Sequence, residues 1–159
     1  MEKLISYFFF MMNRIKVVVI GEGGSGKTEL VRRILHQPAS HRYVPTLGVD
    51  VHPCTVGMTV FDIWDTAGQE RFSGLKEGYF IGAHAAILFQ DVDRRKMLEW
   101  YRLFKQVAGD DAPVVVCGKG RPVTDFHREH NLKYINLEAD HPMAPLAYLD
   151  FQLKQPYAG

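Results

Sequence analysis

The pattern of hydrophobic and polar positions predicts strands and helices that alternate along the chain. Short apolar runs, most of them rich in β-branched residues, predict six strands, at residues 15–20, 49–52, 59–64, 85–90, 113–117 and 133–137. Apolar residues spaced three or four positions apart predict helices at 26–36, 94–107, 124–130 and 143–153. This alternation predicts an α/β fold with a six-stranded, mostly parallel sheet that is flanked by helices on both faces.

Side-chain spacing within these segments indicates which positions face the core. The predicted strands 49–52 and 59–64 form a hairpin with a short turn at Gly57. In the second of these strands, successive side chains point to opposite faces of the sheet. One of its faces carries Val60, Asp62 and Trp64, and the other carries Phe61 and Ile63. The predicted apolar helix faces comprise Leu30, Val31 and Ile34 in the first helix and Met97, Leu98, Tyr101, Phe104 and Val107 in the second.

Composition narrows the class of protein. The 159 residues suit a single domain, with a hydrophobic share of 47% and a charged share of 23% that are ordinary for a globular chain. A net charge of +1 argues against direct nucleic-acid binding and against a strong attraction to anionic membranes. Cys54 and Cys117 form neither a disulfide framework nor a metal-binding spacing, so we expect a reducing compartment and two small core side chains.

An apolar segment, LISYFFFMM at residues 4–12, precedes the first predicted strand. Spanning a bilayer as a helix takes about 20 residues, and no small-residue cleavage site follows the segment, so membrane association is disfavoured. Three interpretations stay open: an additional strand or turn, a sticky tail, or an upstream start with Met11 or Met12 as an alternative initiator. We therefore treat residues 1–13 as an extension and residues 14–159 as the domain.

The strongest chemical signal is GEGGSGKT at residues 21–28, which follows a predicted strand and opens a predicted helix. Glycines allow successive N–H groups to turn toward an anion, and the helix N-terminus adds positive potential. Lys27 would reach the β- and γ-phosphates, and the Thr28 hydroxyl would bind Mg²⁺. The predicted phosphate contacts are Gly21, Glu22, Gly23, Gly24, Ser25, Gly26, Lys27, Thr28 and Glu29.

A second signal, WDTAGQE at residues 64–70, ends another predicted strand. The carboxylate of Asp65 can hold Mg²⁺ directly or through water. Gly68 lets a backbone N–H approach the γ-phosphate, and the amide of Gln69 can position an attacking water. The D-x-x-G pattern is weak alone, but it gains weight because it follows the phosphate-binding pattern at a strand end.

Together these two motifs resemble the phosphate-binding pair of the Ras superfamily of small GTPases. Within that superfamily, RYVPTLGVDVHP (residues 42–53) and GLKEGYFIGAHAAILFQDV (residues 74–92) resemble the Ran family of nuclear-transport GTPases. The resemblance implies that Thr46 completes the Mg²⁺ shell and that Tyr43 lies over the nucleotide beside the catalytic glutamine. It also implies that residues 37–48 and 66–80 are the two switch segments.

The resemblance further implies a function, a Mg²⁺-dependent conformational switch that hydrolyses GTP to GDP in nucleocytoplasmic transport. It assigns catalysis to Gln69, Lys27 and Tyr43, and Mg²⁺ binding to Thr28, Thr46 and Asp65; Gly68, Lys119 and Ala139 join the nucleotide contacts. The implied partners are guanine nucleotide, a GTPase-activating protein, an exchange factor and transport receptors of the importin/exportin type. The implied location is the nucleus and cytoplasm.

The segments that would read the base depart from this family. After the strand 113–117 the family has Asn-Lys-x-Asp, whose carboxylate accepts from the guanine edge, whereas this chain reads GKGRP. Lys119 keeps its packing role if one residue is deleted, but Pro122 stands near the place of the carboxylate and Asp125 lies too far along. At the second base-reading loop, Ala139 can still offer its N–H, and Glu138 is a candidate for the missing carboxylate. The acidic tail that follows the last helix in Ran has no counterpart in this sequence.

These departures leave an alternative of a different class. A non-catalytic Ran mimic, or pseudo-GTPase, would bind nucleotide weakly or with relaxed base specificity and would compete for Ran partners. A P-loop phosphotransferase for a small substrate is less favoured because WDTAGQE has no reason to occur there. A metal site at HREH, residues 127–130, is less favoured than a solvated helix face.

Overall fold

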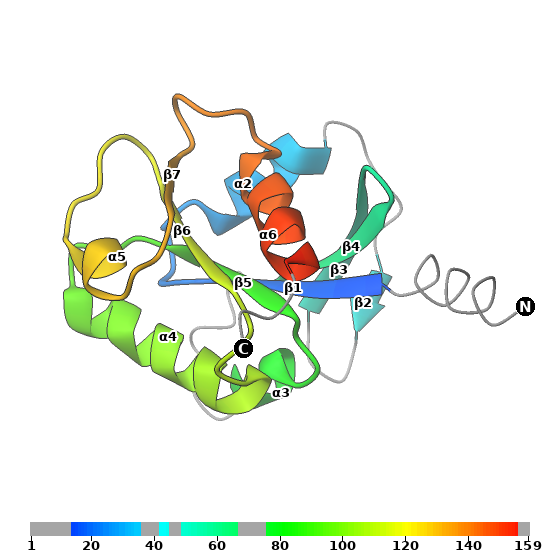
Figure 1. The fold of residues 1–159 in the computed structure, drawn as a ribbon, viewed down its shortest axis with the longest axis horizontal. Coiled ribbons are helices and arrows are strands. Elements are labelled where there is room, and N and C mark those ends of the chain that lie inside the picture. Colours follow the sequence, from blue (N-terminus) through cyan, green and yellow to red (C-terminus); the bar gives the residue numbers. More distant parts are fainter. Residues whose placement is uncertain (1–13, 36–41, 45–48, 67–75, 156–159) are drawn as a thin grey trace, which may run out of the picture.

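The computed structural model describes residues 14–35, 42–44, 49–66 and 76–155 of the chain (Figure 1). The strands are β1 (Arg14–Ile20), β2 (Arg42–Val44), β3 (Val49–Val56), β4 (Thr59–Asp65), β5 (Ala85–Phe89), β6 (Val114–Gly118) and β7 (Tyr134–Asn136). The helices are α2 (Lys27–Leu35), α3 (Lys76–Phe80), α4 (Arg94–Ala108), α5 (Phe126–Glu129) and α6 (Ala144–Lys154). The predicted strands and helices are all present, with ends that differ by a few residues.

The strands form one seven-stranded sheet in the order β2-β3-β4-β1-β5-β6-β7. Strand β3 is antiparallel to both of its neighbours, whereas β4, β1, β5, β6 and β7 pair in parallel. The predicted α/β fold with a mostly parallel sheet is therefore confirmed. The sheet has one strand more than the six expected, because the three-residue β2 pairs with β3 and is too short to carry a periodic pattern of its own.

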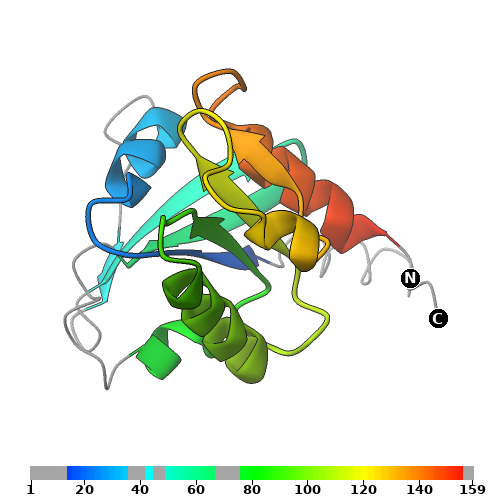
Figure 2. The ribbon, with the colours of Figure 1, turned by 90° about the vertical axis from the view of Figure 1, so that its left-hand side faces the viewer.

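Helices cover both faces of the sheet, as Figures 1 and 2 show. On one face, the apolar side chains of α2 and α6 pack with alternate residues of the strands in a single buried cluster. On the other face, α3, α4 and α5 contribute to a second cluster. Strands β5 and β6 are buried at every position because both of their faces are covered, which explains their uninterrupted apolar sequence.

The predicted alternation in β4 is confirmed. Phe61 and Ile63 are fully buried beneath α2, whereas Val60, Asp62 and Trp64 are only partly buried. Leu30, Val31 and Ile34 form the buried face of α2, also as expected. Cys117 lies fully buried in the same core cluster, and Cys54 packs partly against it.

Helix α4 presents a wider buried face than its sequence pattern predicted. It begins after Asp93, whose side chain accepts a hydrogen bond from the N–H of Arg95 over 3.0 Å, and it ends at Gly109 with a φ of 104°. Met97 and Phe104 are buried as predicted, and Trp100, which the prediction omitted, is 5% exposed. This tryptophan brings α4 into contact with the site described below.

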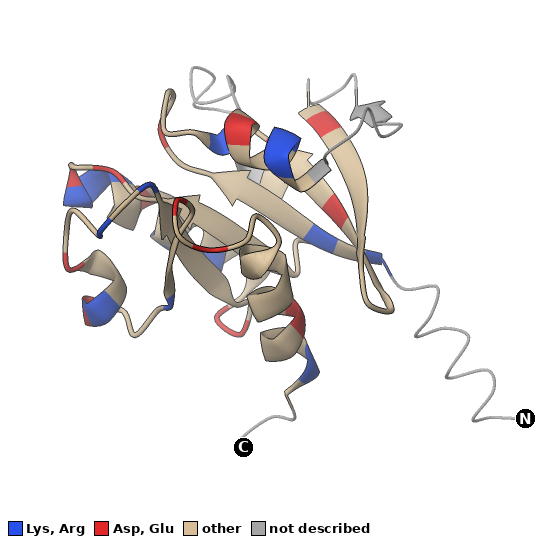
Figure 3. Ribbon diagram, turned by 90° about the horizontal axis from the view of Figure 1, so that it is seen from above, with Lys and Arg blue, Asp and Glu red and all other residues tan. Residues whose placement is uncertain are grey.

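The surface carries both charge signs interspersed over the described elements rather than one face of a single sign (Figure 3). Within the described ranges, none of the helices combines the length and the apolar composition needed to cross a membrane. The apolar segment 4–12 lies outside the described residues.

Two residues of the HREH segment contact neighbouring side chains. Glu129 pairs with Arg94, and the ring of His130 packs on Phe126, with 4.3 Å between ring centroids.

Candidate functional site

The loop of residues 21–28 leaves the carboxyl end of β1, at the centre of the sheet, and enters α2. Gly21 has a φ of 144° and Gly26 has a φ of 105°, values that side chains rarely permit. A Cβ atom at Gly21 would lie 3.1 Å from the Cβ of Phe89, at the end of β5. Both the conformation at position 21 and the close approach of the neighbouring strand therefore favour glycine there.

Lys27 is the first residue of α2, and its side chain folds back along this loop. The ammonium group donates hydrogen bonds to the carbonyl oxygens of Gly21 and Glu22, at 2.6 and 2.7 Å. The residue is only 2% exposed. A buried cation is costly unless it is paired or hydrogen-bonded, so the loop holds a positive charge at its centre by its own backbone carbonyls.

The surroundings of Lys27 suit a phosphate group. Helix α2 has nine residues, and the N–H groups of its first turn have no acceptor within the helix itself. The Ser25 hydroxyl is buried without a hydrogen-bond partner among the described residues. A buried cation, orphaned donors and left-handed glycines in one loop fit the anion of a nucleotide, which is the ligand that the sequence predicted.

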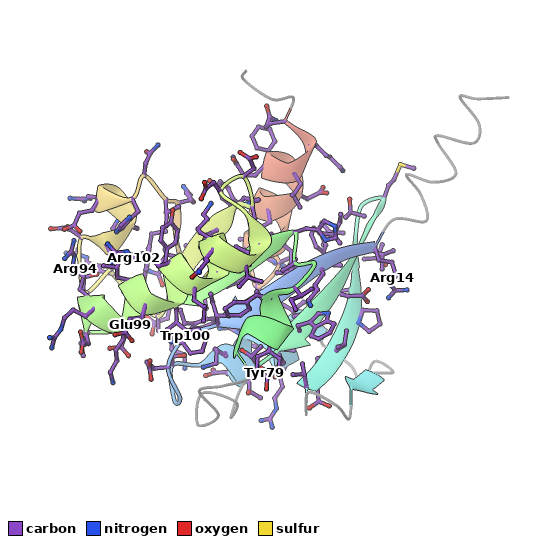
Figure 4. All side chains as sticks on the ribbon, turned by 90° about the horizontal axis from the view of Figure 1, so that it is seen from below. Arg14, Tyr79, Arg94, Glu99, Trp100 and Arg102 are labelled. Atoms are coloured by element: carbon purple, nitrogen blue, oxygen red, sulfur yellow. The ribbon has the colours of Figure 1, made fainter. Side chains whose placement is uncertain are left out.

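The second residue of the loop is tied to α4. The Glu22 carboxylate accepts a hydrogen bond from the indole N–H of Trp100, with 3.1 Å between Oε1 and Nε1. Figure 4 labels Trp100 on α4, and it comes from the helix face that packs on the sheet. Glu22 thus contacts Lys27 through its carbonyl and α4 through its carboxylate, so the loop is held from two sides.

Asp65 is at the carboxyl end of β4, beside the start of the loop. In the parallel pairing of β1 and β4 it lies opposite Val19, two residues before Gly21, and it is 9% exposed. The next residue, Thr66, donates its hydroxyl proton to the carbonyl oxygen of Val19 over 2.5 Å. The strand ends therefore bring a carboxylate to the same sheet edge as Lys27 and Thr28, and an aspartate with a threonine hydroxyl suits the oxygen preference of Mg²⁺.

Lys119 extends from the end of β6 toward the same loop. Its Cε lies 3.9 Å from the position that a Cβ at Gly26 would occupy, and its Nζ pairs with Glu29 of α2 at 2.5 Å. The hydrogen bond from Lys119, followed by its charge, lowers the pKa of the Glu29 carboxyl. The aliphatic part of Lys119 therefore borders the phosphate-binding loop on the side toward β6 and β7.

The loops that follow β6 and β7 are joined to each other. Asn136 Oδ1 accepts from the N–H groups of both Gly120 and Glu138, each at 2.9 Å. The Tyr134 hydroxyl donates to the carbonyl oxygen of Gly120 over 2.9 Å. Burial, the Cys117 thiol and the Glu138 carboxylate together raise the pKa of Tyr134 to about 12, so this hydroxyl stays a donor at neutral pH.

The comparison with protein-family models identifies the family. The model described as "Ras of Complex, Roc, domain of DAPkinase" matches residues 16–120, which is 105 of the 159 residues. The chain belongs to the Roc family. Roc domains are Ras-like GTPases, so the resemblance to the Ras superfamily, the P-loop G-domain fold and the general assignment as a GTP-binding protein are supported. The match does not single out Ran within the superfamily.

The predicted site residues of this Roc domain divide into two groups. The structure brings together the loop 21–28 with Glu29, Asp65, Lys119 and Ala139 at the carboxyl edge of the sheet. Thr46, Gly68 and Gln69 lie outside the described residues, and of Tyr43 the structure describes only the backbone, in β2 opposite Asp50. The catalytic and Mg²⁺-binding roles remain predictions, and so does the contact of Ala139 with the base. In the structure, the Ala139 N–H donates to the carbonyl oxygen of Asn136 over 3.2 Å.

Two contacts in the Roc domain were not foreseen from the sequence. Gln90 folds over the loop after β6, where its amide accepts from the N–H of Val123 at 3.0 Å. A Cβ at Gly118 would lie 2.3 Å from Gln90 Nε2, so Gln90 fills the space that a side chain at the family's asparagine position would use. Asn136 is the second case: it lies within the predicted strand 133–137, and its two acceptor contacts depend on the packing of β6 against β7.

Proposed function

We propose that this Roc domain is a nucleotide-dependent switch that binds GTP with Mg²⁺ and hydrolyses it to GDP. The observation that carries the proposal is the buried Lys27 ammonium, held by the carbonyls of Gly21 and Glu22 inside a left-handed glycine loop. A positive charge in this loop suits a ligand that brings negative charge. Triphosphate is the ligand that the family and the motif both favour.

The described residues can supply most of the binding and positioning in this scheme. Lys27 and the N–H groups of its loop hold the phosphate oxygens and stabilise the charge that develops on them. Thr28 and Asp65 would hold Mg²⁺, which would neutralise part of the phosphate charge. We assign to Gln69 the orientation of the attacking water, to Thr46 the third Mg²⁺ contact and to Tyr43 a position over the nucleotide, as the resemblance implies.

A more specific proposal is that this nucleotide-dependent switch acts in nucleocytoplasmic transport, in the manner of Ran. The support is the sequence of residues 42–53 and 74–92, which overlap the proposed switch segments. The corresponding partners are an activating protein, an exchange factor and importin- or exportin-type receptors, with action in the nucleus and cytoplasm. Binding of a Ran-type transport receptor that requires GTP and is lost with GDP would test this part separately.

One observation favours a second candidate, a non-catalytic competitor for Ran partners. The loop after β6 reads Gly118 to Arg121 without a carboxylate, and the Ala139 N–H already has an acceptor in its own turn. A site that binds phosphate but makes few contacts with the base would bind nucleotides with low affinity or with broad base specificity. Such a protein would bind Ran partners without a regulated cycle of GTP binding and hydrolysis.

Calorimetry on the nucleotide-stripped protein with GTP, GDP and ATP, each with Mg²⁺, tests the proposal. We expect tight binding of GTP and GDP, and slow release of phosphate from GTP in a single-turnover assay. Lys27→Met should weaken binding at least about a hundredfold, because it removes a charge-assisted contact and leaves its partners unpaired. Lys154→Met, on the far end of α6, is the matched control and should bind normally. Binding without any hydrolysis would favour the competitor, and no binding of any nucleotide would refute both candidates.

A further inference from the structure

The loop after β6 lacks the carboxylate that guanine recognition requires, yet a carboxylate reaches that loop from the next strand. We propose that Glu138, which follows β7, is the specificity-determining residue that reads the guanine edge in this domain. The inference rests on the proposed function, because it concerns the base of the nucleotide whose phosphates Lys27 holds. It makes the substrate class a guanine nucleotide rather than any nucleoside triphosphate.

The first step is that Glu138 and Gly120 belong to one rigid unit. Leu137 donates its N–H to the carbonyl oxygen of Gly118 over 2.8 Å, which continues the pairing of β6 and β7 beyond their ends. Asn136 Oδ1 then joins the N–H groups of Gly120 and Glu138, and Tyr134 holds the carbonyl of Gly120. The backbone that carries Glu138 is therefore fixed against the loop that the family uses to read the base.

The second step is the position of the carboxylate itself. Glu138 Oε2 lies 3.7 Å from the position that a Cβ at Gly120 would occupy, so this solvent-exposed side chain lies beside the loop. Gly120 has a φ of 77°, a conformation that glycine adopts freely and that leaves this approach open. Among the described residues, none donates a hydrogen bond to the Glu138 carboxylate, which leaves both oxygens available to a ligand.

Two of the other carboxylates near these loops are already paired. Asp125 pairs with Arg128 of α5 at 3.9 Å. Glu29 is already paired with Lys119. Asp140 lies two residues after Glu138 in the same turn, and its charge is one of the causes that raise the pKa of the Cys117 thiol at the end of β6. Asp140 is thus the nearest competitor, and it provides a matched control.

The third step is chemical. The Watson–Crick edge of guanine presents two adjacent donors, the ring N1–H and the 2-amino group, and one ionised carboxylate can accept from both. Adenine presents an acceptor at N1 and no 2-amino group, so a carboxylate at this place is left unpaired and adenine is rejected. Lys119 borders the phosphate loop beside Gly26, so a base held against Lys119 and read by Glu138 would lie between the two loops.

The test is a set of dissociation constants, measured with Mg²⁺, for GDP, ADP, inosine diphosphate and xanthosine diphosphate. The wild type should bind GDP at least about tenfold more tightly than inosine diphosphate, which lacks the 2-amino donor. Glu138→Gln replaces one of the two acceptor oxygens by an NH₂ donor, so the affinity for GDP should fall by about ten- to a hundredfold. Xanthosine diphosphate, which has an oxygen in place of the 2-amino group, should bind this variant more tightly. Asp140→Asn should leave the GDP preference unchanged, and thermal unfolding checks that each variant is folded.

The outcomes separate this inference from the function on which it rests. Equal binding of GDP and ADP by the wild type overturns the role of Glu138 and leaves phosphate binding intact. Retention of the GDP preference in Glu138→Gln, or its loss in Asp140→Asn, also overturns it. Equal affinity of the wild type for GDP and inosine diphosphate overturns it without any variant. Failure of the wild type to bind any of the four nucleotides refutes the proposed function itself.

Discussion

The indole N–H of Trp100 donates to the Glu22 carboxylate over 3.1 Å and so joins helix α4 to the phosphate-binding loop. Trp100 is 5% exposed and packs at 6.3 Å, centroid to centroid, against Phe80 of α3. The contact therefore connects the loop to two helices on the same face of the sheet. Because Glu22 also holds Lys27 through its carbonyl, the position of α4 bears on the geometry of the buried cation.

Trp100→Phe tests whether helix α4 helps to position the phosphate-binding loop. The variant keeps an aromatic ring but removes the donor, so we expect the free energy of unfolding to fall by about 1–2 kcal/mol, from the lost hydrogen bond and the smaller ring. Affinity for GDP should fall by about three- to tenfold, as measured by calorimetry, because the loop loses one of its two anchors. Trp64→Phe is the matched control in the chain's other tryptophan and should leave GDP affinity unchanged. A Trp100→Phe protein with wild-type affinity would show that α4 does not position the loop.

Asp65 gives a prediction about the metal. If Asp65 and Thr28 hold Mg²⁺, removal of Mg²⁺ with a chelator should weaken GDP binding to the wild type by at least about tenfold. Asp65→Asn keeps the size of the side chain but removes its charge, so the variant should bind GDP more weakly with Mg²⁺ present and lose less on chelation. Asp62→Asn, on the same strand and paired with Arg14, is the control. Equal dependence on Mg²⁺ in Asp65→Asn and wild type would contradict the assignment.

The strands and most helices were predictable because their cores are built from periodic apolar runs. Buried β5 and β6 are continuous apolar segments, and β4 alternates because its faces differ in burial. Helix α3 escaped prediction because five residues that include a glycine, KEGYF, show no helical period. Tyr79 and Phe80 are nonetheless almost fully buried, so tertiary packing and not local pattern accounts for that element.

The same distinction applies to the site. The position of Lys27 could be predicted from the sequence because the glycine spacing defines its loop, and that of Asp65 because it ends an apolar strand. The contacts of Trp100 with Glu22 and of Gln90 with the loop after β6 join residues that are 78 and 33 positions apart. No local pattern predicts such pairs, since they depend on the order of strands in the sheet and on the helix that covers it.

Lys16 gives a pH dependence of stability. Its ammonium lies 3.6 Å from the ring centroid of Trp64 and donates to the carbonyl oxygen of Ile81 at 2.8 Å, and burial lowers the pKa of Lys16 to about 8. Between pH 8 and the ordinary lysine pKa of about 10.5, the unfolded chain binds the proton more tightly than the folded one. The contribution of Lys16 to stability should therefore rise across this window.

Chemical denaturation of the wild type and Lys16→Met across this range measures the effect. The wild type should gain free energy of unfolding relative to Lys16→Met as the pH rises from 8 to 10.5. Comparing the two proteins removes the contributions of Tyr79 and Tyr101, whose pKa values are raised by burial and which titrate at similar pH. A constant difference over the whole range would show that the Lys16 pKa is ordinary.

Gly118 and Gln90 give a prediction about the loop that departs from the family. A Cβ at Gly118 would lie 2.3 Å from Gln90 Nε2 and 2.6 Å from its Cγ, so Gly118→Ala should cost about 1–3 kcal/mol of stability by forcing Gln90 off the loop. Gln90→Ala alone should cost about 1 kcal/mol, because Val123 loses its acceptor. In the double variant the clash is gone, so its loss should be less than the sum of the two single losses. Additive losses in denaturant unfolding would mean that Gln90 does not exclude a side chain at 118, and that some other constraint keeps the family's asparagine out of this loop.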